Sequence, residues 1–180
     1  MRYRVWVYTA IILFGGGMAL GVAGPSDIGL PPEYIEGLKE LSRFIIPGSP
    51  LTVLFILFKN VFALLVSFMF SPFLCIIPVL SLAGNGWLIG FISETAVHQK
   101  SLVYVLAGVL PHGVFELPAF IIGQAAALSF GSTILLSLSS KWRGRLVADL
   151  KRSARYLTIA CILLIPAAII ETYVTPLLLT

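Results

Sequence analysis

Long apolar segments alternate with short polar ones along nearly the whole chain. The apolar segments cover about 1–24, 51–70, 73–92, 101–140 and 157–179. A helix needs about 20 mainly apolar residues to cross the hydrocarbon core of a bilayer. Each segment is long enough for one crossing, so the pattern predicts a chain that passes through a membrane several times.

The first apolar segment follows Arg2 and Arg4 and ends at Val22-Ala23-Gly24, which is similar to a signal-peptide cleavage site. Its apolar core is longer than the roughly 7–15 residues of a signal peptide. We therefore expect residues 1–24 to be an uncleaved first span.

The segment 101–140 is too long for one straight crossing. Forty helical residues would extend about 60 Å, twice the hydrocarbon thickness. Two crossings would place the basic residues that follow on the outer side, against the positive-inside rule. The sequence therefore predicts a half-helix at 102–110, a break at Pro111-His112-Gly113, and one full span at 114–138.

Two polar segments separate the spans. Residues 25–50 carry a net charge of −2 and an apolar stripe at helical spacing. This predicts an extracytoplasmic amphipathic helix, either resting on the membrane surface or binding a partner. Residues 141–156 are basic and indicate the cytoplasmic side, again as a lipid-facing or partner-binding segment. Its basic residues are Lys141, Arg143, Arg145, Lys151, Arg152 and Arg155.

Composition agrees with this pattern. Of the 180 residues, 58% are hydrophobic and 11% are charged, and the mean hydropathy is +1.00. A soluble domain carries about a quarter charged residues, so a soluble globular fold is excluded. We expect one all-α membrane domain over 1–180: five spans, one half-helix or re-entrant segment, and interfacial amphipathic helices.

The predicted topology places the N-terminus in the cytoplasm and the C-terminus, after a last span within 157–180, outside the cell. The net charge of +4 does not indicate nucleic-acid binding, because half of the twelve basic residues lie in the one segment beside the membrane. Cys75 and Cys161 lie in apolar runs and are expected to be free thiols.

Polar residues within the spans are the candidate functional residues, because ionisable groups in hydrocarbon are costly. Their expected depths allow convergence of Asn60, Asn85, His112, Glu116 and Glu171. Lys59 is a further candidate partner for either carboxylate. Three interpretations remain open: a structural polar lock between helices, a solvated pocket, or a chemical site.

Chemistry has little support from motifs. The chain has no H-E-x-x-H, no G-x-S-x-G and no phosphate-binding loop. Zinc sites use three or four protein ligands, whereas His112 has one carboxylate at ligand spacing, Glu116. The pair Glu94 and His98 repeats this spacing at a loop edge. We therefore predict no catalytic residue, no bound metal and no cofactor.

Small residues recur where helices are expected to pack. A four-residue repeat lines one face of the fourth span, and similar faces occur on the first span, at Gly17 and Gly21, and on the third. Such faces let helices approach closely, and internal packing is favoured over a homodimer interface. The repeat of the fourth span consists of Ala119, Gly123, Ala127 and Gly131. The face of the third span consists of Gly86 and Gly90.

Several of these elements together resemble a known family. A span with Asn60 precedes N-G-x-x-x-G at 85–90, then L-P-H-G-V-F-E-L-P-A, then a last span ending I-E-T-Y-V-T-P. This order is similar to the stage II sporulation protein M family of integral membrane proteins, over about 55–176, with residues 51–140 as the core. The matching positions are Asn60, Asn85, Gly86, Gly90, Pro111, His112, Gly113, Glu116, Pro118 and Glu171.

The resemblance implies a membrane protein without catalysis of its own. The family's founding member assembles with a cell-wall hydrolase and a second membrane partner, and some relatives are similar to permease components. This chain departs from that setting, because 25–50 is its one sizeable extracytoplasmic segment. We expect an assembly or scaffold component with membrane or soluble partners, and a second copy of the chain is one candidate partner. The alternative is a transport subunit with a polar site at His112 and Glu116.

Overall fold

The computed structural model describes residues 3–24, 36, 46–99, 101–137, 144 and 146–178, and all regular structure in these ranges is helical. This confirms the all-α membrane bundle. The amphipathic helix predicted within 25–50 lies largely outside the described residues. The helices are α1 (Tyr3–Ala23), α3 (Pro50–Phe70), α4 (Ile76–Gln99), α5 (Leu102–Ser137), α6 (Leu146–Tyr173) and α7 (Thr175–Leu178).

Five of these helices are long and apolar enough to cross a membrane. They match the five predicted spans, with shifts at the ends. Helix α6 begins at Leu146, well before residue 157, so residues 146–156 of the basic segment form the first turns of the last helix. At 28 residues, α6 extends about 42 Å and must project beyond the hydrocarbon core or tilt within it.

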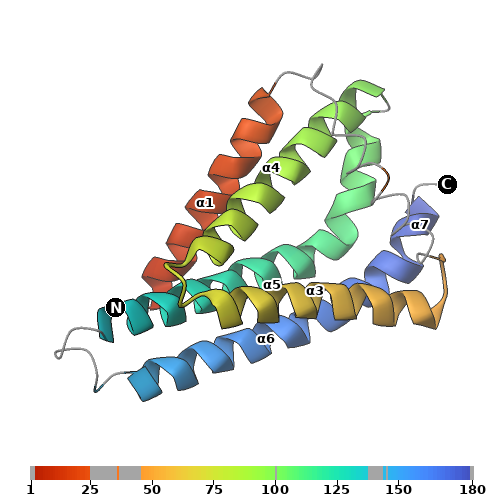
Figure 1. Ribbon diagram of the computed structural model, residues 1–180. Coiled ribbons are helices and arrows are strands. Elements are labelled where there is room, and N and C mark those ends of the chain that lie inside the picture. The colour runs from red at the N-terminus through yellow and green to blue at the C-terminus, as the bar shows by residue number, and fades with distance from the viewer. Residues whose placement is uncertain are drawn as a thin grey trace.

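The prediction of a half-helix followed by a break was wrong in one respect. Residues 102–137 form one continuous helix, α5, with Pro111 and Pro118 inside it. Figure 1 shows that α5 bends partway along its length. Proline removes one backbone hydrogen bond and its ring clashes with the preceding turn, which bends a helix without ending it when the neighbouring turns hold.

The bend allows α5 to pack in two directions (Figure 1). One part runs beside α4, and the other lies with α3 and α6. Helix α1 packs mainly on α4, and α5 packs mainly on α6. The two groups meet near the start of α1 and diverge toward the other end of the molecule.

The backbones of α1 and α4 are in direct contact at glycine residues of both helices. A Cβ atom added at Gly17 would lie 2.2 Å from the carbonyl oxygen of Ala83, and one added at Gly86 would lie 2.1 Å from that of Phe14. Gly21 and Gly90 are equally tight, at 2.1 Å and 2.2 Å. Glycine is therefore required along this contact, because any side chain would separate the helices.

Helix α5 passes between two apolar clusters. Ala126 packs in one with Leu64 of α3 and Leu164 of α6. Its neighbour Ala125 packs in the other with Ala10 of α1 and Leu82 of α4. Small side chains on α5 let the helices of both groups approach it closely, so this helix joins the two halves of the bundle.

The connection between α3 and α4 is a tight turn that packs on α5. Leu74 and Cys75 have positive φ angles of 54° and 56°, a conformation that non-glycine residues rarely adopt. A Cβ atom added at Gly131 would lie 2.2 Å from the carbonyl oxygen of Ser71. The glycine on α5 thus makes room for the turn.

Candidate functional site

The centre of the candidate site is the first part of α5. His112 and Glu116 lie four residues apart, so they share one face of the helix. Nε2 of His112 is 3.7 Å from Oε2 of Glu116, and the side chains are 16% and 30% exposed. Although Pro111 precedes them directly, the helix is continuous here, which keeps the two side chains in register.

The last turns of α6 bring the second carboxylate. Glu171 contributes an oxygen that lies within 4.8 Å of ligand atoms of both His112 and Glu116. Just beyond it, Oγ1 of Thr175 is 3.3 Å from Nδ1 of His112. The backbone N–H of Gly48 donates to the carbonyl oxygen of Thr172 at 3.1 Å, which ties the chain before α3 to this end of α6.

Helix α3 supplies the amide. Nδ2 of Asn60 donates to Oε1 of Glu116 at 3.1 Å. A cavity of about 360 Å³ beside this contact is lined by Lys59, Asn60, Asn85 and Glu116, among others. A second cavity of about 90 Å³ is lined by Asn85, His112 and Glu116, among others. Glu116 therefore lines both cavities, whose walls combine these polar groups with apolar side chains.

Asn85 belongs to this site by position rather than by a direct contact. Its amide donates to the carbonyl oxygen of Ser81 in the same helix, at 2.8 Å, while the residue borders both cavities. The structure thus brings together His112, Glu116, Glu171 and Asn60, and places Asn85 at the edge of the same space.

The remaining predicted positions have other surroundings. Gly113 is buried in α5, whereas Pro118 is exposed. Nε2 of His98 lies 2.7 Å from Oε1 of Glu94 near the end of α4, and this pair is separate from the site. The small residues of the fourth span, Ala119, Gly123, Ala127 and Gly131, are all buried, and a Cβ atom at Gly123 would lie 2.8 Å from Leu64.

Among the buried polar residues that sequence reasoning missed, the largest is Gln124 of α5, which is 0% exposed. Its Oε1 accepts from Oγ of Ser67 on α3 at 2.6 Å. Its Nε2 donates to Oγ of Ser81 on α4 at 2.9 Å. A glutamine between Gly123 and Ala125 in an apolar span was the available signal, since such side chains bond across helices.

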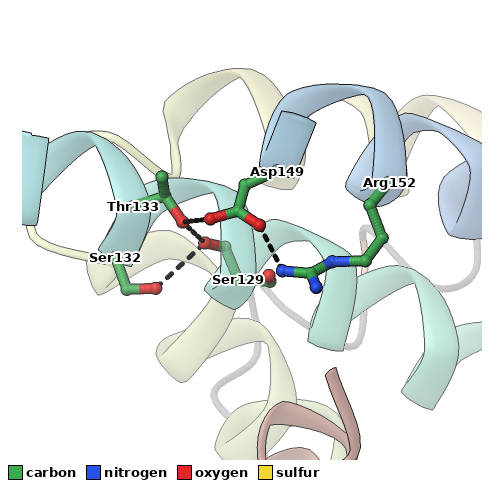
Figure 2. Close-up of polar contacts among 5 residues, drawn as sticks. All are labelled: Ser129, Ser132, Thr133, Asp149 and Arg152. Carbon is green, nitrogen blue, oxygen red and sulfur yellow. Dashed lines mark hydrogen bonds and ion pairs between the residues drawn. The ribbon is translucent and has the colours of Figure 1, made fainter. Parts of the chain in front are cut away.

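A second polar cluster joins the far ends of α5 and α6 (Figure 2). The carboxylate of Asp149 is paired with Arg152 and accepts from Oγ1 of Thr133 at 3.2 Å. A cavity of about 10 Å³ lies between these residues and Trp6, which is space for a single water molecule. This cluster therefore connects the two helices and leaves no room for a larger ligand.

Of the predicted basic residues, Arg152 takes part in this ion pair, and Lys151 and Arg155 are exposed. Lys141, Arg143 and Arg145 lie outside the described residues. Within the described part of the basic segment, Arg152 thus links to Asp149 inside the bundle, and Lys151 and Arg155 lie on the surface of α6.

Comparison with known proteins agrees with a membrane helix bundle. The family described as Stage II sporulation protein M matches residues 9–176, a range that covers α3, α4, α5 and α6 and all of α1 (Tyr3–Ala23) except its first six residues. The chain belongs to this family. A relative in Methanocaldococcus jannaschii, described as an uncharacterized protein, is 29% identical over 175 residues, covering 96% of this chain and 95% of the relative. No solved structure matches the chain.

Membership of the stage II sporulation protein M family, with five helices of spanning length, shows that the chain is a multi-pass integral membrane protein. The matched range contains the α1–α4 glycine contact, the bent helix α5 and the residues around Glu116. The residues of the candidate site therefore all lie within the matched range.

Proposed function

We propose that the protein is a non-enzymatic membrane assembly component that binds partner proteins within the bilayer. The observation that carries the proposal is the opening between α3 and α4. Lys59 of α3 and Asn85 of α4 are both exposed and line the cavity of about 360 Å³. Charged and amide groups at this depth are costly against lipid, so a second membrane chain that covers the opening stabilises them.

The helix contacts support the same interpretation. Within the described residues, α3 and α4 have far fewer contacts with each other than α1 has with α4, so the opening between them is bounded by two helices that each pack elsewhere. A partner helix can enter there without breaking either pair. We expect α3 and α4 to form the contact surface, with the N-terminus of the chain cytoplasmic and the C-terminus extracytoplasmic.

Site-specific photocrosslinking in intact membranes tests the assembly role. A photoreactive residue at Ala63, which lines the opening, should give a discrete crosslinked product. The matched control is Ile12, which is 72% exposed on α1 and should give none. Replacing Lys59 and Asn85 together with leucine should lower the product at Ala63 roughly tenfold, because each tenfold in affinity needs only about 1.4 kcal/mol.

Equal products at Ala63 and Ile12, or a product at Ala63 that persists in the Lys59→Leu, Asn85→Leu double variant, would contradict the proposal. Unfolding of that variant in detergent should match wild type, since both side chains are exposed. This control separates loss of partner binding from loss of the fold.

A transport subunit is the second candidate, and the cavities beside Glu116 favour it. Many transporters form their binding sites where a membrane helix is interrupted, and the bent part of α5 with Glu116 is a related departure from a straight helix. A transport role predicts that Gly113→Cys, which lines the smaller cavity, reacts with a charged thiol reagent in a Cys75→Ser, Cys161→Ser background. Val114→Cys, whose position is 63% exposed on the bundle exterior, is the matched control. Equal, slow labelling of both positions would remove the support for transport.

A further inference from the structure

The side chains of His112, Glu116 and Glu171 lie close enough together to bind one metal ion. Sequence spacing does not indicate this set, because Glu171 is 55 residues after Glu116. One ligand atom from each lies within 4.8 Å of the other two. Ligand atoms of a tetrahedral zinc ion, bound at about 2.0–2.1 Å, are separated by roughly 3.3–3.5 Å. The 3.7 Å between Nε2 of His112 and Oε2 of Glu116 is already close to that separation.

The contacts of Thr175 are compatible with a neutral His112 ring that is protonated at Nδ1. Oγ1 of Thr175 donates to the carbonyl oxygen of Ile170 at 3.4 Å, so it is left to accept from Nδ1–H of His112 at 3.3 Å. The unprotonated Nε2 then faces Glu116. A metal-bound histidine typically donates its other N–H to an oxygen in this way.

The Glu116 carboxylate is oriented in a similar way from outside the ligand set. Asn60 donates to Oε1, which leaves Oε2 directed at His112. Two lone pairs then face each other at 3.7 Å, beyond direct hydrogen-bond distance. A cation between them removes the repulsion.

Charge favours the same occupant. Two neighbouring carboxylates within the bundle carry two negative charges when both are ionised, and such charges must then be paired or neutralised. The charge of Lys59 acts on Glu171 and His112 only at longer range, because none of the ion pairs found among the described residues includes this exposed lysine. A divalent cation with a neutral imidazole and two carboxylates gives a centre of zero net charge.

We propose that His112, Glu116 and Glu171 bind a divalent transition-metal ion, of which zinc is the representative. Nε2 of the histidine and one oxygen of each carboxylate are the ligands. The fourth position faces the cavity of about 90 Å³ beside His112, Gly113 and Glu116. The ion joins α5 to α6 beside the bend, and this inference holds whether or not the opening between α3 and α4 binds a partner.

Metal analysis of the purified full-length protein tests the proposal. After exchange into detergent and equilibration with zinc at about micromolar concentration, wild type should retain about one zinc per chain. Glu171→Gln and His112→Ala should each lower zinc affinity by at least about tenfold, the lower end of the effect of losing even a supporting residue. His98→Ala is the matched control, since His98 contacts Glu94 at the same four-residue spacing without a third ligand.

X-ray absorption at the zinc edge of the wild type needs no variant and guards against misfolded ones. It should show one imidazole nitrogen with oxygen ligands and no sulfur, which distinguishes this site from Cys75 or Cys161. Thr175→Val should weaken zinc binding about tenfold while leaving the ligands in place. Zinc bound equally by wild type, His112→Ala and Glu171→Gln, no zinc retained by wild type, or sulfur ligation would each overturn the proposal.

Discussion

Replacing Gly86 with alanine should lower the free energy of unfolding by about 1–3 kcal/mol, the usual cost of overpacking. The added Cβ atom would lie 2.1 Å from the carbonyl oxygen of Phe14 and 3.0 Å from the backbone nitrogen of Met18. Both atoms belong to the backbone of α1, so no side chain can move aside. The helices must separate along their whole contact. Unfolding of the purified protein in mixed micelles by added SDS measures the loss.

Gly84 supplies the matched control, two residues away on the same helix. A Cβ atom there meets nothing within 4 Å. Alanine favours helix over glycine by up to about 1 kcal/mol, so Gly84→Ala should leave stability unchanged or raise it. The two variants should therefore change stability in opposite directions. Equal changes would show that the α1–α4 contact is looser than described.

The second large effect is expected at Gln124, which connects α5 to Ser67 of α3 and Ser81 of α4. Gln124→Ala removes both hydrogen bonds and leaves a cavity at a fully buried position. Hydrogen bonds between membrane helices contribute about 0.6 kcal/mol each on average, and cavities from large-to-small changes cost about 2–5 kcal/mol in soluble cores. We expect a total loss of about 2–4 kcal/mol, measured by the same unfolding assay.

Gln124→Met separates the two contributions, because methionine keeps most of the volume and removes the hydrogen bonds. The Gln124→Met variant should lose about 1–2 kcal/mol of unfolding free energy. Combining Gln124→Met with Ser67→Ala should cost less than the sum of the two single changes, since both remove the same bond. A fully additive double variant would contradict the Ser67–Gln124 contact.

The bend in α5 illustrates what local sequence could and could not supply. Pro111, Gly113 and the length of the apolar run indicated that residues 101–140 could not form one straight span. They did not indicate whether the helix ends or bends. That depends on contacts with α4 on one part of α5 and with α3 and α6 on the other, which keep the helix continuous through both prolines.

The candidate site divides in the same way. His112 and Glu116 could be paired from their four-residue spacing, and depth allowed Asn60, Asn85 and Glu171 to lie nearby. Sequence spacing could not predict that Asn60 contacts Oε1 of Glu116 or that Thr175 contacts Nδ1 of His112. The prediction that no metal is bound considered only ligands at close spacing along the chain. Glu171 is a third potential ligand that only the folded structure brings beside His112 and Glu116.

The sequence by itself determined that this protein is an all-helical membrane domain with five spans. Hydrophobic length and charge are local properties, and the bilayer requires every buried backbone group to be bonded within the chain. The tertiary structure alone decided which polar residues meet. Gln124 between two serines, and Glu171 beside His112 and Glu116, depend on how α3, α4 and α6 pack around a bent α5, because residues distant in sequence are brought together only by that packing.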